Sequence, residues 1–435
     1  MTEKEQLVWR RVDQQREAAI GWLAALVQTS RGGEEATQAY VADKFKRVGC
    51  DEVEIIRADP RMLPIEHESS DPGGIQPGER ISVAGRLRGA GVGPSLLLWA
   101  HPDSSPVGDT EGWRHDPFAG QIEDGRMYGW GVSDDLIGVA TTACALEAVL
   151  HAGLQPRGDV ILASAPSKGR AQGIIAILER GYGADASIYL HPAESGAGLG
   201  EIKAMTSAWL TFRITVPGHP PETTEPGHEV FFHQAVNPLD KAWVIYQALQ
   251  KLDEKRGREG HHPLLDKAIG RSTNLGVTCL RCGDDESPGL VSPDCVMTGF
   301  LVCPPGEQMD EVQVQVVQAV EDAAADDDWL REHRPKVEWL SRMIRGTEVP
   351  VEHPLYQTVS GAIEVVTGVQ PRNYPLHPGS DVRNPTLHSG IPTVGFGPLS
   401  GDSTQIGGRD EWIDVEDYVR ALKVVGSIIV NWCGV

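Results

Sequence analysis

Leu96-Leu97-Leu98-Trp99-Ala100-His101-Pro102-Asp103 joins an apolar run to a histidine and, two residues later, an aspartate. The run up to Ala100 predicts a buried strand, and side chains two residues apart leave a strand on the same side. Asp103 can therefore accept the second ring N–H of His101 and fix its tautomer, as carboxylates do around metal-binding histidines. The sequence thus predicts chemistry at the end of this strand.

A second carboxylate belongs to a neighbouring turn. Asp134 follows the turn Gly129-Trp130-Gly131 and opens a helical pattern. A carboxylate at the tip of a strand–turn–helix unit lies where α/β folds collect their sites. Asp134 is therefore a candidate site residue.

Strand and helix patterns alternate on both sides of this stretch. Apolar periodicity predicts helices over 5–28, 34–48, 135–151 and 171–181. Short apolar runs predict strands over 53–56, 81–87, 95–100, 159–165 and 186–190. This alternation predicts an α/β domain built on a sheet. The long connection 104–128 is expected to be functional, because loops of that length are otherwise uncommon in compact domains.

The pattern changes after Thr206. Strands are expected over 208–216, 273–280 and 294–303, and helices over 238–252 and 308–323. The α/β pattern then resumes with helices over 354–367 and 414–432 and a strand over 392–397. We therefore predict a split sheet domain made of residues 1–206 and 343–435, with a smaller α+β domain inserted over 207–342.

Composition narrows the class of protein. The 435 residues carry a formal charge of −22, which argues against nucleic acid and anionic membrane surfaces as partners. Seven cysteines are few and odd in number, which suits a reducing compartment. The charged N-terminus has no signal-peptide core and no apolar run reaches membrane length, so a cytoplasmic location is expected.

Further motifs are spaced along nearly the whole chain. They are His101-x-Asp103, Trp113…Asp116-Pro117-Phe118, Met127-Tyr128-Gly129-x-Gly131, Asp134, Ala184-Asp185…His191-Pro192, Ser292-Pro293-Asp294-Cys295, Pro305-Gly306-Glu307, Gly379-Ser380-Asp381, Gly395-Phe396-Gly397-Pro398 and Asp410-Glu411-Trp412. Together they resemble the metallopeptidase family of acetylornithine deacetylase, succinyl-diaminopimelate desuccinylase, aminoacylase and carboxypeptidase G. The resemblance implies a zinc-peptidase-like, mixed-sheet catalytic domain, an inserted lid domain that also dimerises, and usually two bridged metal ions.

The sequence departs from this family at two metal-site segments. Family members carry a Glu-Glu pair after the strand expected near 160–165, in which the first glutamate is the general base and the second a metal ligand. Here that segment is Pro166-Ser167-Lys168-Gly169, which contains no carboxylate. The C-terminal metal histidine of the family corresponds to Gly407.

The ligands of one metal remain. The resemblance places that metal on His101, Asp134 and His191, the last of which replaces an acidic residue before a proline. All three side chains can bind a divalent transition metal, and three protein ligands leave positions open for water and substrate. We therefore predict a mononuclear site with one divalent ion per chain, Mn²⁺ or Zn²⁺ before Fe²⁺ or Co²⁺. His191 could instead cap a strand in a decayed site, and His101 with Asp103 could be a structural pair.

Candidate catalytic residues lie beside these ligands and in the inserted domain. Asp103, Ser167 and Lys168 are predicted to act next to the metal, although Ser167 and Lys168 are also typical of an ordinary loop. In the family, a lid histidine reaches the neighbouring subunit's site and stabilises the tetrahedral intermediate. His219 and His228 are the candidates for that histidine, and His233 is a weaker one.

Two candidate substrate-binding residues border the Gly379-Ser380-Asp381 motif. His377 could contact the substrate or replace the lost C-terminal metal ligand, although a loop histidine is more often a surface residue. Arg383 could bind a substrate anion or form a salt bridge.

The main functional expectation is metal-dependent hydrolysis of a C–N bond in a small aromatic or carboxylate-bearing molecule. Without the usual glutamate base, water activated by the metal suits an activated electrophile better than a peptide amide. Within this superfamily, 5-nitroanthranilic acid aminohydrolase deaminates an activated aromatic ring. Hydrolytic deamination of such an amine, for example 5-nitroanthranilate, is therefore the sharpest hypothesis.

Two alternatives stay open. Trp329-Leu330-Arg331-Glu332-His333 and Asn431-Trp432-Cys433-Gly434 resemble the branch of acetylornithine deacetylase and formylaminopyrimidine deformylase. That likeness favours an amidohydrolase that removes an N-acyl or N-formyl group. The other alternative is a catalytically silent relative that binds a small ligand, supported by the missing Glu pair. In each case the expected partners are a small molecule and a second copy of the chain, as a dimer through the lid or a larger homo-oligomer.

Overall fold

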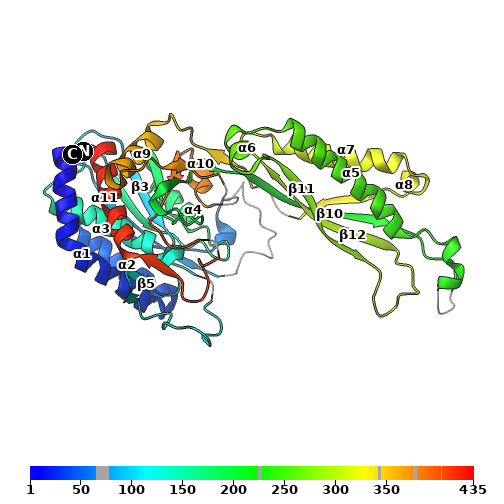
Figure 1. Cartoon of the computed structure of the whole chain (residues 1–435), viewed down its shortest axis with the longest axis horizontal. Coiled ribbons are helices and arrows are strands. Elements are labelled where there is room, and N and C mark those ends of the chain that lie inside the picture. The colour runs from blue at the N-terminus through cyan, green and yellow to red at the C-terminus, as the bar shows by residue number, and fades with distance from the viewer. Residues whose placement is uncertain (65–77, 105, 224–227, 341–343, 376–379, 403) are drawn as a thin grey trace. The chain divides into compact units, whose positions relative to one another are not determined.

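The computed structural model describes residues 1–64, 78–104, 106–223, 228–340, 344–375, 380–402 and 404–435. These residues form two compact units (Figure 1). One unit contains Thr206–Thr347, and the other contains the described residues up to Met205 and from Glu348 onward. Each unit has its own buried apolar cluster, so each is described separately.

The larger unit is built on a six-stranded sheet in the order β1-β2-β6-β3-β7-β16. Its strands are β1 (Glu52–Ala58), β2 (Arg80–Leu87), β6 (Val160–Ser164), β3 (Leu96–Ala100), β7 (Ala186–Tyr189) and β16 (Thr393–Gly395). The four strands from β6 to β16 are parallel, whereas β1 and β2 are antiparallel. The central strands β3, β6 and β7 are buried at every position, as expected for parallel strands covered on both faces.

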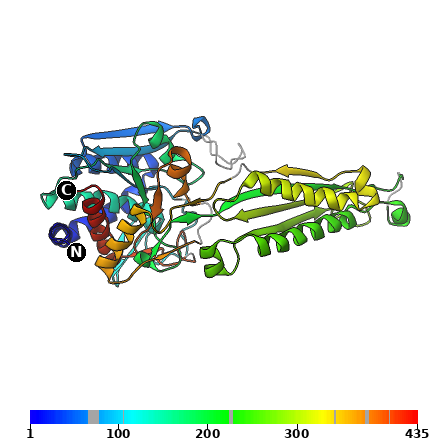
Figure 2. The same cartoon turned by 90° about the horizontal axis from the view of Figure 1, so that it is seen from above.

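Helices cover both faces of this sheet. One face packs against α1 (Glu3–Ser30), α2 (Gly33–Val48), α3 (Ile137–His151), α9 (Pro354–Thr367) and α11 (Val415–Trp432). The other face packs against α4 (Gly173–Glu179), with α10 (Arg383–Ser389) beside it. Figure 2 shows α1 and α11 side by side, with the two termini close together on this unit. No helix in the described ranges is long and apolar enough to cross a membrane.

The smaller unit has an antiparallel four-stranded sheet in the order β11-β12-β10-β13. The strands are β11 (Asn274–Cys282), β12 (Asp294–Cys303), β10 (Ala208–Pro217) and β13 (Lys336–Trp339). Alternate residues of β10 are fully buried, because one face of the sheet packs against α5 (Pro238–Glu259) and α7 (Met309–Ala325). Both helices run along the sheet in Figure 2.

The remaining strands of the described residues are short and form three small sheets. β4 (Gln121–Glu123) and β5 (Arg126–Tyr128) form a sheet with β17 (Trp412–Asp414). β8 (Glu201–Ile202) pairs with β15 (Arg372–Asn373), and β9 (Met205–Thr206) pairs with β14 (Thr347–Glu348).

The predicted mixed-sheet α/β domain with an inserted α+β domain is confirmed. Element ends differ by a few residues, most clearly at α5, which continues to Glu259 rather than ending near 252. Several short elements were not predicted: β4, β5, β13, α6 (Pro263–Ile269) and α8 (Asp328–Glu332). Each spans seven residues or fewer, which is too short for apolar periodicity to stand out.

Candidate metal centre

The register between β3 and β7 brings two histidines together. Trp99 pairs with Tyr189 across these parallel strands, and their rings stack with centroids 4.2 Å apart. His101 and His191 follow Trp99 and Tyr189 by two residues, just beyond the ends of β3 and β7. Their ring centroids are therefore only 5.8 Å apart, and both side chains are buried.

Asp134 completes the cluster from the turn before α3. Gly131 starts this turn at φ 75°, a conformation that favours glycine, and Asp134 itself has an extended φ of −132°. Its Oδ1 lies 2.9 Å from Nε2 of His101 and 3.2 Å from Nε2 of His191. Because Asp134 and Asp135 are not helical, α3 begins at Ile137 and not at 135 as expected.

The donor set fits a divalent transition metal. His101, Asp134 and His191 each offer one ligand atom, and these atoms lie within 4.8 Å of one another. Two ligand atoms of a tetrahedral zinc ion are about 3.3 Å apart, which is close to the measured separations. Two imidazole nitrogens and one carboxylate are ligands that Zn²⁺, Mn²⁺ and Fe²⁺ accept.

The electrostatics of the cluster also favour a cation. Burial opposes protonation of His101, but Asp134 and Asp103 outweigh it and raise the pKa of His101 to about 10. Burial and the Lys203 ammonium lower the pKa of His191 to about 4, so this imidazole is neutral. Burial opposes ionisation of Asp134, yet the two histidines hold its pKa well below the usual value. The cluster is thus an ionised carboxylate between a protonated His101 and a neutral His191, and a bound cation would take the place of the His101 proton.

Asp103 orients His101 and the segment after β6. Nδ1 of His101 lies 3.3 Å from Oδ1 of Asp103 and 2.9 Å from its carbonyl oxygen. The same carboxylate accepts the backbone N–H groups of Ser167 and Lys168, at 2.8 and 2.7 Å. The carboxylate also accepts a hydrogen bond from Nη2 of Arg80 at 2.8 Å. Because its oxygens are fully used in this way, Asp103 is a positioning group for its neighbours.

Lys168 contacts the oxygen of Asp134 that faces away from the histidines. Its Nζ lies 2.5 Å from Oδ2 of Asp134, whereas Oδ1 faces the two imidazoles. Burial opposes the charge of Lys168, but Asp134, Asp103 and Asp381 outweigh it and raise the pKa of this lysine. The ammonium therefore stays charged and neutralises one side of the Asp134 carboxylate.

The buried ion pair of Lys203 and Glu194 lies on the Nδ1 side of His191. Nδ1 of His191 lies 2.8 Å from both the Pro192 carbonyl oxygen and Nζ of Lys203. Lys203 is almost completely buried and pairs with Glu194 at 3.0 Å. Nδ1 can accept from the Lys203 ammonium or, in the other tautomer, donate to the Pro192 carbonyl, and only the second tautomer leaves the Nε2 lone pair facing Asp134.

These residues border a cavity of about 310 Å³. Its lining consists of His101, Asp134, Ser167, Lys168, Tyr189, His191, Glu194, Ser380, Asp381 and Ile406. Five of the ten predicted site residues therefore face one space: the three ligands with Ser167 and Lys168. Tyr189, Glu194 and Asp381 were not predicted as site residues.

The other predicted residues lie elsewhere or outside the described chain. Arg383 is buried, donates from Nη1 to the Ser380 carbonyl at 2.6 Å and is absent from the cavity lining given above. His219 and His228 belong to the smaller unit, where His219 bridges to Val236 and His228 accepts the backbone N–H of Val291 at 3.3 Å. His377 lies outside the described residues.

The missed residues had weak sequence signals. Glu194 follows His191 by three residues, and Asp381 belongs to a motif that was noted without a role. Lys203 carried no signal, because a lone lysine after a predicted strand is normally a surface residue. Only the pairing of Lys203 with Gly395 of β16 places it behind His191.

Comparison with known proteins identifies the family. A sequence profile of peptidase family M20/M25/M40 matches residues 97–431. The chain is 25% identical over 389 residues to N-formyl-4-amino-5-aminomethyl-2-methylpyrimidine deformylase of Bacillus subtilis (strain 168), covering 84% of this chain and 86% of that protein.

Solved structures share the fold. An aminopeptidase PepT from Bacillus cereus superposes with a TM-score of 0.68 at 17% identity, covering 95% of this chain and 98% of that one. The YXEP protein of Bacillus subtilis, described as a dinuclear metal-binding peptidase, gives a TM-score of 0.60 at 16% identity, with 94% and 98% covered.

These findings confirm the resemblance inferred from the motifs. The family consists of metal-dependent hydrolases of carbon–nitrogen bonds, and the prediction of an enzyme of that class is confirmed. The profile match covers most of the chain and includes every residue of the His101, Asp134 and His191 cluster. The chain therefore belongs to peptidase family M20/M25/M40.

Proposed function

We propose that this enzyme hydrolyses the N-formyl group, or a similarly small N-acyl group, of a small aromatic amine with one divalent metal per chain. The observation that carries the proposal is the cluster of two imidazoles and one carboxylate at the wall of a 310 Å³ cavity. The similarity to a deformylase supports the amidohydrolase alternative better than deamination of 5-nitroanthranilate.

A single metal is proposed because a lysine stands at the second position. A carboxylate that bridges two metals uses one oxygen for each ion. Here Oδ1 of Asp134 faces His101 and His191, and Oδ2 is held by the Lys168 ammonium at 2.5 Å. Two positive charges would then compete for one oxygen, so the ammonium disfavours a second ion.

The roles of the side chains follow from this geometry. His101, Asp134 and His191 would hold the ion, which would act as a Lewis acid toward an amide carbonyl and an attacking water. Asp103 keeps His101 in the tautomer whose Nε2 faces the site. The Lys168 ammonium borders the cavity and can donate a hydrogen bond to the carbonyl oxygen as negative charge develops there.

The size of the cavity favours a small acyl group on the amine that is released. A formyl group carries only hydrogen on its carbonyl carbon, so it places the least bulk against Tyr189 and Ile406 in the lining. The formyl group itself is uncharged, so its recognition does not require Arg383, which is buried and donates to the Ser380 carbonyl.

The proposal is tested by formate release together with metal content. The protein is stripped of metal, reloaded with Mn²⁺ or Zn²⁺ and incubated with N-formyl, N-acetyl and free aromatic amines. We expect formate from the formyl compounds, about one metal per chain by mass spectrometry, and loss of both in His191→Ala. His261→Ala, which alters an exposed histidine of the smaller unit, is the control.

Other products would redirect the proposal. Ammonia from the free amines without formate from the formyl compounds would restore deamination as the activity. A protein that binds no metal under any loading condition would contradict the metal site and favour a silent ligand-binding relative.

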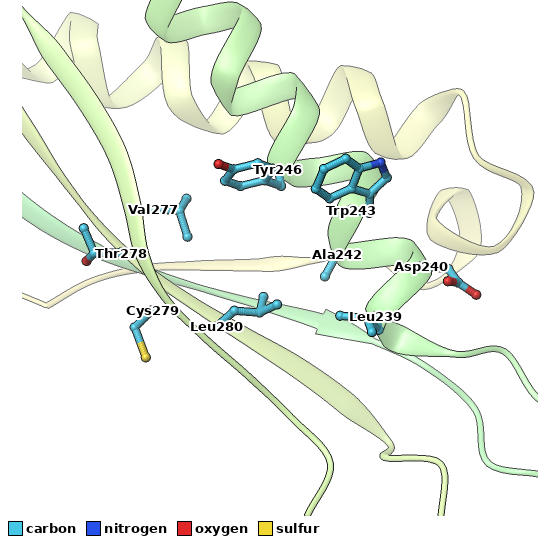
Figure 3. Close-up of a pocket in the computed structure, with 9 residues that line it drawn as sticks. All are labelled: Leu239, Asp240, Ala242, Trp243, Tyr246, Val277, Thr278, Cys279 and Leu280. Carbon is cyan, nitrogen blue, oxygen red and sulfur yellow. The ribbon is translucent and has the colours of Figure 1, made fainter. Parts of the chain in front are cut away.

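We further propose that residues 207–342 form a lid domain and that two copies associate through it. β11 is the outer strand of its sheet, and an apolar groove of about 760 Å³ lies between this strand and α5 (Figure 3). Leu239, Trp243 and Leu280 line the groove and are about half exposed. A second copy of β11 is the proposed occupant, because an outer strand offers unpaired backbone groups to an identical strand across a two-fold axis.

A further inference from the structure

Three carboxylates line the metal-site cavity, and they differ in their partners. Asp134 lies between the two histidines and Lys168. Glu194 is paired with the buried Lys203 ammonium through both oxygens, at 3.1 and 3.0 Å. Asp381 instead accepts hydrogen bonds from two neutral groups, the Ser167 hydroxyl and Nδ2 of Asn384, the latter at 3.1 Å. Neutral donors orient a carboxylate without cancelling its charge, and the nearby Lys168 ammonium is hydrogen-bonded to Asp134, so Asp381 remains the most available base of the three.

Asp381 lies beside the Pro166–Gly169 segment, which lacks the carboxylate that could act as a base. The family resemblance implies a pair of glutamates in that segment, whereas the segment itself contains no carboxylate. The Ser167 hydroxyl from this segment donates to Oδ2 of Asp381, which comes from a loop 214 residues further along the chain. A carboxylate from another part of the sequence thus stands beside the place that lacks one.

Asp381 is distinct from the ligand cluster. The described residues contain one group of His, Cys, Asp or Glu side chains close enough to share an ion, and it consists of His101, Asp134 and His191. Asp381 lines the same cavity without belonging to that group. It is therefore placed to contact the reacting molecule in the cavity and not the ion.

We propose that Asp381 is the proton acceptor and donor of the hydrolysis, an inference that rests on the proposed amidohydrolase function. An O–H bond of the attacking water breaks, its proton moves to the Asp381 carboxylate, and the water oxygen bonds to the amide carbon. The C–N bond then breaks while Asp381 returns the proton to the departing nitrogen. The products are formic acid and the free amine, and Asp381 is ionised again.

The first test compares Asp381→Asn with Asp381→Glu and with Asp43→Asn, which alters an exposed aspartate of α2. We expect Asp381→Asn to lower kcat by about 10²- to 10⁴-fold with unchanged metal content and little change in KM. Asp381→Glu restores part of the rate, and Asp43→Asn behaves as the wild type. A wild-type rate in Asp381→Asn, or loss of its metal, would overturn the proposal.

The second test does not depend on turnover. Acetohydroxamic acid is titrated into the metal-loaded protein by calorimetry, in buffers that differ in ionisation enthalpy. This ligand binds metals as an anion, so its O–H proton must move to a base. In the wild type Asp381 accepts that proton and almost none reaches the buffer, whereas Asp381→Asn releases about one proton per bound ligand.

The two tests separate the failure of this inference from failure of the proposed function. Equal proton release by the wild type and Asp381→Asn would refute Asp381 as the acceptor even if formamides are hydrolysed. If the wild type hydrolyses no formamide yet shows the expected difference in proton release, the proposed substrate is wrong and the role of Asp381 stands. Absence of metal-dependent hydroxamate binding would overturn both.

Discussion

At the scale of single residues, the site is defined by how each oxygen of Asp134 is used. Oδ1 faces two imidazole nitrogens and Oδ2 faces the Lys168 ammonium. The carboxylate therefore links a metal site to a fixed positive charge of the protein itself. Unlike a bound metal ion, the Lys168 ammonium cannot dissociate. The positive charge next to Oδ2 of Asp134 is therefore permanent.

Replacing Lys168 with methionine should tighten metal binding and slow catalysis. The ammonium repels a nearby cation, so its removal is expected to raise the affinity for Zn²⁺ or Mn²⁺ at least ~10-fold. Turnover should fall by about 10- to 100-fold, because a donor to the developing oxyanion is lost. Affinity is measured by competition with a chromophoric chelator, with Lys336→Met as an exposed control. Weaker binding in Lys168→Met would show that the lysine mainly orients Asp134.

His115, in the long connection after β3, should make a pH-dependent contact with Asp410 in a C-terminal loop. The imidazole of His115 lies between Glu123, at 2.8 Å, and Asp410, at 3.2 Å, and these carboxylates raise its pKa. A pKa raised on folding contributes stability that is complete below the unfolded value of about 6.5 and is lost as pH rises through the folded value. His115→Gln should therefore destabilise the protein more at pH 6 than at pH 9.

Urea unfolding of both proteins at the two pH values measures this difference. The exposed histidine variant His261→Gln is a suitable control, because it lies in the other unit. An equal effect of His115→Gln at pH 6 and pH 9 would mean that the charged form of His115 is not involved.

At the scale of elements, the site depends on how closely α3 approaches the strand ends. Gly138 lies in the first turn of α3, four residues after Asp134. A Cβ atom there would lie 1.9 Å from the Leu190 carbonyl oxygen and 2.6 Å from Cβ of Ala100. Both contacts belong to the strand ends that carry His191 and His101. Close approach of this helix thus fixes Asp134 against both histidines.

Gly138→Ala should disturb the metal site from within the core. The added methyl must push α3 away from β3 and β7, with an expected loss of about 2 kcal/mol or more of unfolding free energy. Metal affinity should fall as well, because Asp134 moves with the helix. Gly361→Ala in α9 is the matched control: no atom lies within 4 Å of its added Cβ, and a stability gain of up to ~1 kcal/mol is expected. Calorimetry and metal titration of both variants provide the measurement, and a Gly138→Ala protein with normal affinity would contradict the argument.

At the scale of the whole molecule, the chain contains two units with separate apolar cores. All residues of the candidate site come from the unit that contains β3 and β7. The smaller unit instead carries the outer strand β11 and the apolar groove next to it. Chemistry and the proposed association therefore reside in different parts of the chain.

Charged substitutions in the groove between β11 and α5 should dissociate the proposed dimer without affecting the metal site. Trp243→Glu, alone or with Leu280→Glu, is expected to convert a dimer into a monomer in light scattering coupled to size exclusion, because an unpaired charge in an apolar interface is costly. Val314→Glu, on the exposed side of α7, should leave the mass unchanged. Wild-type protein that is monomeric at all concentrations would refute the proposed interface.

Sequence patterns and the family resemblance predicted the fold class, the inserted domain and the three candidate metal ligands. Their signals are local: an apolar strand followed by a histidine, a glycine turn followed by an aspartate, and motifs of a known family. Several elements of seven residues or fewer, such as β4, β13 and α6, were missed, because periodicity needs more than one or two turns or pleats to be visible.

The tertiary structure was needed for the groups that surround those ligands. Lys168 meets Asp134 across 34 residues, and Ser167 meets Asp381 across 214. Lys203 reaches His191 only because its backbone bridges to β16. Such contacts depend on strand order and register, which arise from packing of the whole sheet and leave no periodic signal in the sequence.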